Sequence, residues 1–82
     1  MSTSQEDIRQ WLERAKQNNA THLIVVCDTY DWDDYPVEVQ PSENIHECIA
    51  KYDRKNMQKI MEVYNLKLDI EKQLNEGRSY NL

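Results

Sequence analysis

The stretch CDTYDWDDYPVEV, residues 27–39, holds most of the side chains that could do chemistry. Carboxylates and aromatic rings crowd together in it, and no lysine or arginine lies between Lys16 and Lys51. Clustered carboxylates can hold a divalent cation or attract a basic surface, and exposed aromatic rings are favoured at protein interfaces. The candidate binding residues are Asp28, Tyr30, Asp31, Trp32, Asp33, Asp34, Tyr35 and Glu38.

A dedicated metal site is one interpretation of these carboxylates. An EF-hand loop needs alternating oxygen ligands, then a glycine, then a glutamate at its twelfth position. Here Tyr35 occupies the third ligand position and Pro36 the glycine position. The pattern therefore favours weak, unspecific cation binding over a specific calcium site.

Zinc binding and nucleophilic catalysis need cysteine and histidine in matched positions. His22, Cys27, His46 and Cys48 are suitable types, but no CxxC pair is present. The simpler interpretation is core thiols and half-buried histidines. The chain has a single glycine, no GxSxG motif and no glycine-rich phosphate loop. We expect no catalytic residue, no metal site and no cofactor, and we interpret the protein as a non-enzyme.

Charge is distributed unevenly along the 82 residues. Residues 1–42 hold three basic and eight acidic side chains, whereas residues 43–82 hold seven of each, which gives the formal net charge of −5. A surface of one sign attracts the opposite sign and repels its own. Direct nucleic-acid binding needs lysine and arginine against phosphates, so the sequence argues against it.

Length and composition indicate one small soluble domain, residues 1–82, with a modest core that oligomerisation would help to stabilise. The N-terminus lacks the basic start and apolar run of a signal peptide, and no apolar stretch approaches the roughly 20 residues of a membrane span. Two lone cysteines are typical of reduced thiols. We expect a cytoplasmic protein with no membrane contact.

Three elements are predicted in the first half of the chain. Thr3 or Ser4 caps a helix whose apolar stripe runs from Ile8 to Ala15, with Thr3 and Glu6 as a capping box. The run THLIVVCD, residues 21–28, predicts a strand buried on both faces. The run YPVEVQ, residues 35–40, alternates and contains a proline, which is typical of an edge strand. The acidic stretch between the two strands would be the loop of a hairpin.

The second half begins with a helix that Ser42 is expected to cap and that residues 53–56 end. Residues 57–68 fit either a strand or the start of one long helix that reaches Glu76. The strand is favoured, because a strand buried on both faces needs a neighbour on each side. Asp69 would then cap a short last helix that Gly77 ends.

These elements predict an α+β fold in the order α-β-β-α-β-α. The crossover helix returns the third strand parallel to the second, so it lies antiparallel beside the first. The expected architecture is a three-stranded antiparallel sheet, in the order second, first, third strand, covered by helices.

Two blocks of the sequence resemble a family of small proteins associated with phages and mobile elements. The first has the form THLIVVCDT-D--DYPV-V and spans residues 21–39, and the second has the form MEVY-L----E-QLNE and spans residues 61–76. The resemblance covers most of the chain after the first helix. It implies an accessory protein of a mobile element, and it assigns no activity to any residue.

Two functional hypotheses of different classes follow. In the first, the acidic and aromatic hairpin docks on a basic surface of a host protein, such as the nucleic-acid-binding site of a defence nuclease. In the second, the protein binds a small molecule, a nucleotide or a metal ion, with sites between subunits if it is a homo-oligomer. The hairpin can also be interpreted as a solvated turn whose rings cover a small core.

Overall fold

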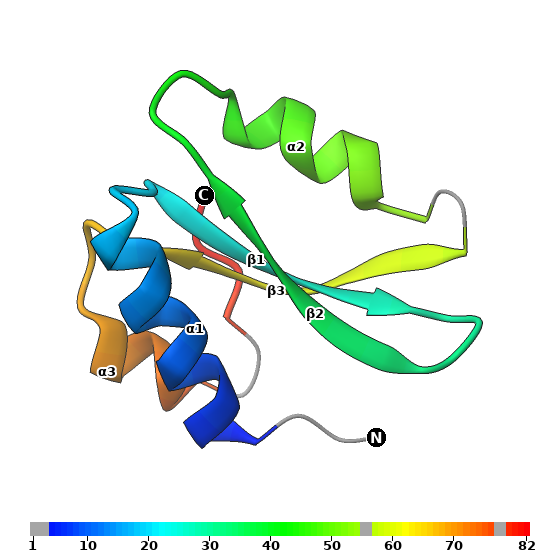
Figure 1. The fold of residues 1–82 in the computed structure, drawn as a ribbon, viewed down its shortest axis with the longest axis horizontal. Helices are drawn as coiled ribbons and strands as arrows, with labels where there is room; N and C mark the ends of the chain where they lie inside the picture. Colours follow the sequence, from blue (N-terminus) through cyan, green and yellow to red (C-terminus); the bar gives the residue numbers. More distant parts are fainter. Residues whose placement is uncertain (1–3, 55–56, 77–78) are drawn as a thin grey trace.

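The computed structural model describes residues 4–54, 57–76 and 79–82. The helices and strands follow the predicted α-β-β-α-β-α order (Figure 1). The radius of gyration is 11.8 Å, close to the value of about 12 Å expected for a compact domain of this length. The elements are α1 (Gln5–Gln17), β1 (His22–Asp28), β2 (Asp33–Val39), α2 (Ile45–Tyr52), β3 (Gln58–Asn65) and α3 (Ile70–Leu74).

The three strands form one antiparallel sheet in the order β2-β1-β3, which confirms the predicted topology. The ambiguous segment is a strand, as favoured from the sequence, and not part of a long helix. In β1, positions 23 to 27 are buried without interruption, because the strand has a neighbour on each edge and a helical layer on each face.

A β-bulge in β3 explains why its sequence also fits a helix. The register with β1 shifts between Val25 and Val26, so that Val25 lies opposite Glu62 while Val26 lies opposite Ile60. Met61 is therefore the extra residue of β3 at this point. Because a bulge places two successive residues on one face, Ile60 comes to share a face with Val63, the three-residue spacing that a helix would also show.

The sheet separates two apolar cores (Figure 1). One face packs Leu23, Val25 and Tyr64 against α1 and α3. The other face packs Ile24, Val26 and other side chains against α2. The strand predicted to be buried on both faces is confirmed, because Leu23 and Val25 belong to one core and Ile24 and Val26 to the other.

Helix caps differ in detail from the prediction. The capping box of α1 joins Ser4 to Asp7, whose backbone N–H groups and side-chain oxygens are 3.2 Å apart in both directions. It lies one residue later than predicted, and Thr3 lies outside the described residues. The predicted cap of α2, Ser42, is wrong: Asn44 accepts from the backbone N–H of His46 at 2.8 Å. Ser42 is instead part of a turn closed from the N–H of Glu43 to the carbonyl of Gln40.

Buried polar side chains fix the C-terminal part of the chain. Asp69 caps α3 as predicted, accepting from the N–H of Lys72, while Gly77, its expected stop, lies outside the described residues. Gln73, only 2 % exposed, bonds both the N–H and the carbonyl of Asn65 at the end of β3. The segment after α3 then returns to the sheet, where Tyr80 forms a parallel bridge with Val63.

Within the described ranges, no helix is long and apolar enough to cross a membrane. Cys27 and Cys48 are both free thiols, and both are buried, as the sequence predicted.

Candidate functional site

The tip of the β1–β2 hairpin consists of residues 29–32 and is shorter than the predicted loop, because β2 begins at Asp33, two residues before the predicted strand. Asp28 organises this turn from its first position. Its carbonyl accepts from the N–H of Trp32 at 2.6 Å, and its Oδ1 accepts from the N–H of Tyr30 at 2.9 Å. Aspartate side chains in turns typically form such local bonds. One carboxylate oxygen of Asp28 therefore already has a hydrogen-bond partner within the fold.

The tip is tied to the third strand as well as to its own hairpin. Both the backbone N–H and the hydroxyl of Thr29 donate to the carbonyl of Met57, each at 2.7 Å. The turn is therefore attached at its base to the residue that precedes β3. This attachment limits how far the tip can move without opening the end of the sheet.

Two aromatic rings project from the tip into solvent. Tyr30 is 73 % exposed and Trp32 is 58 % exposed. Trp32 also has a φ of 58°, in the left-handed region that costs a residue with a Cβ about 1–2 kcal/mol. Lys59, on β3, places its ammonium nitrogen 5.3 Å from the centre of the Trp32 ring, within the range of a cation–π contact.

The eight predicted binding residues do not form one patch, because the strands divide them between the two faces of the sheet. Asp28 lies opposite Asp33 on the face that packs against α2. Asp34 lies opposite Cys27 on the other face, in a row that continues to Lys59 on β3. Only Tyr30, Asp31 and Trp32 stand at the tip itself.

Two of the eight serve the fold in addition to Asp28. The ring of Tyr35 packs against the core under α2, and its hydroxyl accepts from the side chain of Gln58. Glu38 lies toward the far end of β2, where it accepts from the side chain of Asn18 at 3.0 Å. The exposed part of the predicted site is thus Tyr30, Asp31, Trp32 and Asp33, with Asp34 partly exposed beside them.

The carboxylates of the hairpin diverge instead of converging on one point. Among the residues that the structure describes, no three histidine, cysteine, aspartate or glutamate side chains come together as a metal site would require. Asp28 and Asp33 face one another across the strands, a like-charge pair that weakens the hairpin. The arrangement spreads negative charge over the tip and both faces of the hairpin.

Neither thiol is placed as a nucleophile. Burial raises the pKa of the Cys27 thiol, and a hydrogen bond with Asp34 raises it further. Burial likewise raises the pKa of Cys48, with the Glu43 carboxylate adding to the effect. A raised pKa keeps a thiol protonated, and the thiolate is the reactive form.

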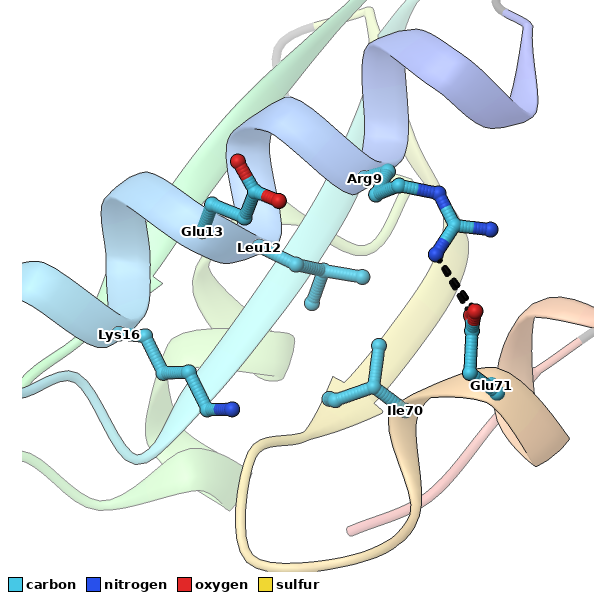
Figure 2. A pocket seen from close by; sticks show the side chains of 6 residues that line it. All are labelled: Arg9, Leu12, Glu13, Lys16, Ile70 and Glu71. Carbon is cyan, nitrogen blue, oxygen red and sulfur yellow. Dashed lines mark hydrogen bonds and ion pairs between the residues drawn. The ribbon is translucent and has the colours of Figure 1, made fainter.

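A pocket of about 220 Å³ lies between α1 and α3 (Figure 2). Arg9 bridges the two helices, and one of its nitrogens lies 2.7 Å from each carboxylate oxygen of Glu71. Leu12 and Ile70 form the apolar floor between them. The lining carries two cations and two carboxylates, and the pocket is smaller than the roughly 300 Å³ at which ligand sites usually begin. We interpret it as the junction of two helices.

Sequence reasoning missed Lys59 and Thr29, which complete the surroundings of the tip. Lys59 is far from Trp32 in the sequence. Its position opposite Cys27 in the sheet depends on the bulge at Met61. Thr29 bonds Met57, which is equally remote in the sequence, so no local turn pattern predicts this contact.

Comparison of the chain with protein-family models, with curated proteins and with solved structures gave no match.

Proposed function

We propose that the protein is a non-enzymatic binding protein whose hairpin tip docks on a basic surface of a partner protein. The observation that carries this proposal is Trp32, a large ring that is 58 % exposed on a backbone with a φ of 58°. Strained residues of this kind persist where the surrounding structure holds them, and they cluster at binding sites. Here Asp28 and Thr29 do the holding.

The charge around the tip supports a basic partner. Asp31 and Asp33 are exposed on either side of Trp32, and Asp34 follows on the strand. The paired Asp28 and Asp33 carboxylates weaken the isolated hairpin, and a partner's arginine or lysine would relieve their repulsion. Charge complementarity of this type speeds association and selects the partner. The Trp32 ring, which would become buried in the complex, would supply most of the affinity.

The class of partner is inferred from the resemblance to proteins of phages and mobile elements. Small accessory proteins of such elements often act by binding a component of the host cell. A host protein that binds nucleic acid, such as a defence nuclease, presents the cationic surface that these carboxylates would occupy in place of phosphates. In this proposal the protein contacts no nucleic acid itself.

A crosslinked pull-down from a bacterial host lysate tests the proposal. The tagged protein is compared with a variant carrying Asp31→Asn, Trp32→Ala, Asp33→Asn and Asp34→Asn. A matched control carries Glu13→Gln, Glu47→Gln, Glu76→Gln and Leu68→Ala, which remove the same charge and one exposed apolar side chain elsewhere. The expected result is a partner that the native and control proteins retain and the hairpin variant loses.

Added salt should weaken the same complex, because the rim contacts are electrostatic. Circular dichroism of the three proteins establishes that each is folded. A partner held equally by the hairpin variant would contradict the proposal, and so would one that the control variant also loses.

A further inference from the structure

The exposed ring of Trp32 already binds a cation of its own chain. The Lys59 ammonium nitrogen lies 5.3 Å from the centre of the ring, inside the limit of about 6 Å for a cation–π contact. Trp32 is nevertheless 58 % exposed and belongs to neither apolar core. The ring is therefore a surface platform for a positive charge, and Lys59 shows which kind of group it accepts.

Lys59 reaches the ring from the third strand of the sheet. It lies opposite Cys27 of β1, and Cys27 lies opposite Asp34 of β2, so the three residues form one row across the sheet. Within residues 4–54, 57–76 and 79–82, the Lys59 ammonium forms no ion pair. Its contact with Trp32 is thus not part of a salt bridge that holds the strands together.

Two carboxylates beside the ring also remain open to a partner. Asp31 and Asp33 flank Trp32 in the chain, and both are exposed. Among the residues that the structure describes, none forms a hydrogen bond or an ion pair with either carboxylate. A ligand at the tip therefore meets an aromatic face and negative charge together.

A guanidinium group matches this combination better than an ammonium group does. It is planar, so it stacks flat on an indole ring while the N–H groups at its edge point outward and bond carboxylates. An ammonium group is compact and strongly hydrated, and it meets a carboxylate as a point charge. Arginine can make both kinds of contact at once, whereas lysine largely has to choose between them.

We propose that the hairpin tip selects arginine, and that an arginine side chain of the partner replaces Lys59 on the Trp32 ring. This inference rests on the proposed function, because it names the side chain by which the tip recognises a basic surface. Lys59 is then an internal competitor. A lysine of the partner gains little by displacing it, since one ammonium group replaces another, and this exchange disfavours surfaces that carry lysine alone.

Nuclear magnetic resonance titration of the full chain with two model peptides tests this proposal. One peptide carries three arginines spaced by glycines, and the other carries three lysines at the same positions. Both have blocked ends, and the ionic strength is constant. The backbone amides of residues 29–34 and the indole N–H of Trp32 should shift and saturate with the arginine peptide. The lysine peptide should bind at least about threefold more weakly, the effect of one exposed cation–π contact.

Two lysine variants test the competition. Lys59→Met removes the ammonium group and keeps a side chain of similar length. Lys51→Met is the matched control: it removes the same charge from α2, where Lys51 lies 5.8 Å from the ring of Tyr52. The arginine peptide should bind Lys59→Met at least about twofold more tightly than it binds Lys51→Met.

A third variant tests the aromatic face. Trp32→Leu keeps an apolar side chain on the same backbone but has no π system. It should bind the arginine and lysine peptides equally, through the carboxylates alone. A preference for arginine that survives in Trp32→Leu would place the selection elsewhere and overturn the proposal.

Two further results would overturn it. If the native protein bound the two peptides equally at the tip, selection of arginine would be wrong, while docking on basic surfaces in general would stand. Equal affinities of Lys59→Met and Lys51→Met for the arginine peptide would exclude Lys59 as a competitor. The pull-down with the hairpin variant decides the proposed function separately, because it does not depend on which basic side chain the partner presents.

Discussion

The two ends of the central strand use polar residues in opposite ways. At the hairpin end, carboxylates and rings stand in solvent on a turn held by bonds to the backbone carbonyls of Asp28 and Met57. At the His22 end, polar side chains are buried and bond one another or the backbone, as Gln73 does to Asn65. The exposed side chains of the tip, Tyr30, Asp31 and Trp32, form none of these bonds and can change while the turn keeps its shape, whereas the other end depends on the Gln73 side chain.

The largest expected effect is at Gln73. Gln73→Ala removes the buried side chain that bonds both backbone groups of Asn65, so the N–H of Asn65 loses this partner and its carbonyl keeps only the N–H of Leu68. We expect the free energy of unfolding to fall by about 2–4 kcal/mol, measured by urea denaturation.

Gln10, an exposed glutamine of α1, supplies the control for Gln73. Gln10→Ala should change the same free energy by no more than about 0.5 kcal/mol. Equal stability of the two variants would show that the buried hydrogen bonds of Gln73 contribute nothing measurable to the stability of this end of the sheet.

A smaller effect is expected at Trp32, where two substitutions separate the ring from the backbone. Glycine adopts a positive φ without steric cost, whereas alanine retains the Cβ that is strained at 58°. Trp32→Gly should therefore be more stable than Trp32→Ala by about 1 kcal/mol in thermal or urea unfolding, while both lose the proposed partner. A Trp32→Ala variant as stable as Trp32→Gly would show that the turn is unstrained.

The smallest effect concerns the dependence of stability on pH at the His22 end. The folded chain holds the pKa of His22 below 6.5, so the unfolded chain binds more protons near pH 6 and stability falls as the pH is lowered below this value. His22→Gln should flatten this part of the profile, and His46→Gln should keep most of it. Thermal unfolding between about pH 5 and 7.5 measures the slopes, and equal slopes for the native protein and His22→Gln would exclude His22 as their source.

Much of the fold could be predicted because the strongest patterns in the sequence reflect burial. The apolar stripe of α1 and the unbroken apolar run of β1 each admit one structure, and the need of β1 for two neighbours fixes the sheet order. The start of α2 was placed two residues early because a turn uses Ser42, and local propensity does not distinguish a turn residue from a cap.

The bulge in β3 marks a second limit of sequence patterns. A one-residue shift exchanges the faces of everything beyond it, so Lys59 joins the row of Cys27 only because Met61 is inserted into the ladder. The strict alternation of a regular strand therefore fails at Met61 and Glu62, although the predicted strand is present as β3.

The sequence predicted which residues belong to the candidate site, but not how the fold arranges them. The sequence shows which side chains lie between residues 27 and 39, but the pleat of the strands sends Asp33 and Asp34 to different faces. The pocket lined by His22, His46 and Lys67 could not be found in this way, because only the fold brings these three residues together.

The bridge between Val63 and Tyr80 makes the backbone amide of Val63 a probe of slow motion in the segment after α3. The N–H of Val63 donates to Ser79 and its carbonyl accepts from Asn81, so this one residue of β3 is bonded to the segment after α3 through both its backbone groups. In deuterated water its amide would exchange when that segment lifts away, even while β1 and β3 remain joined. The amides that face β1 would exchange only when the sheet itself opens.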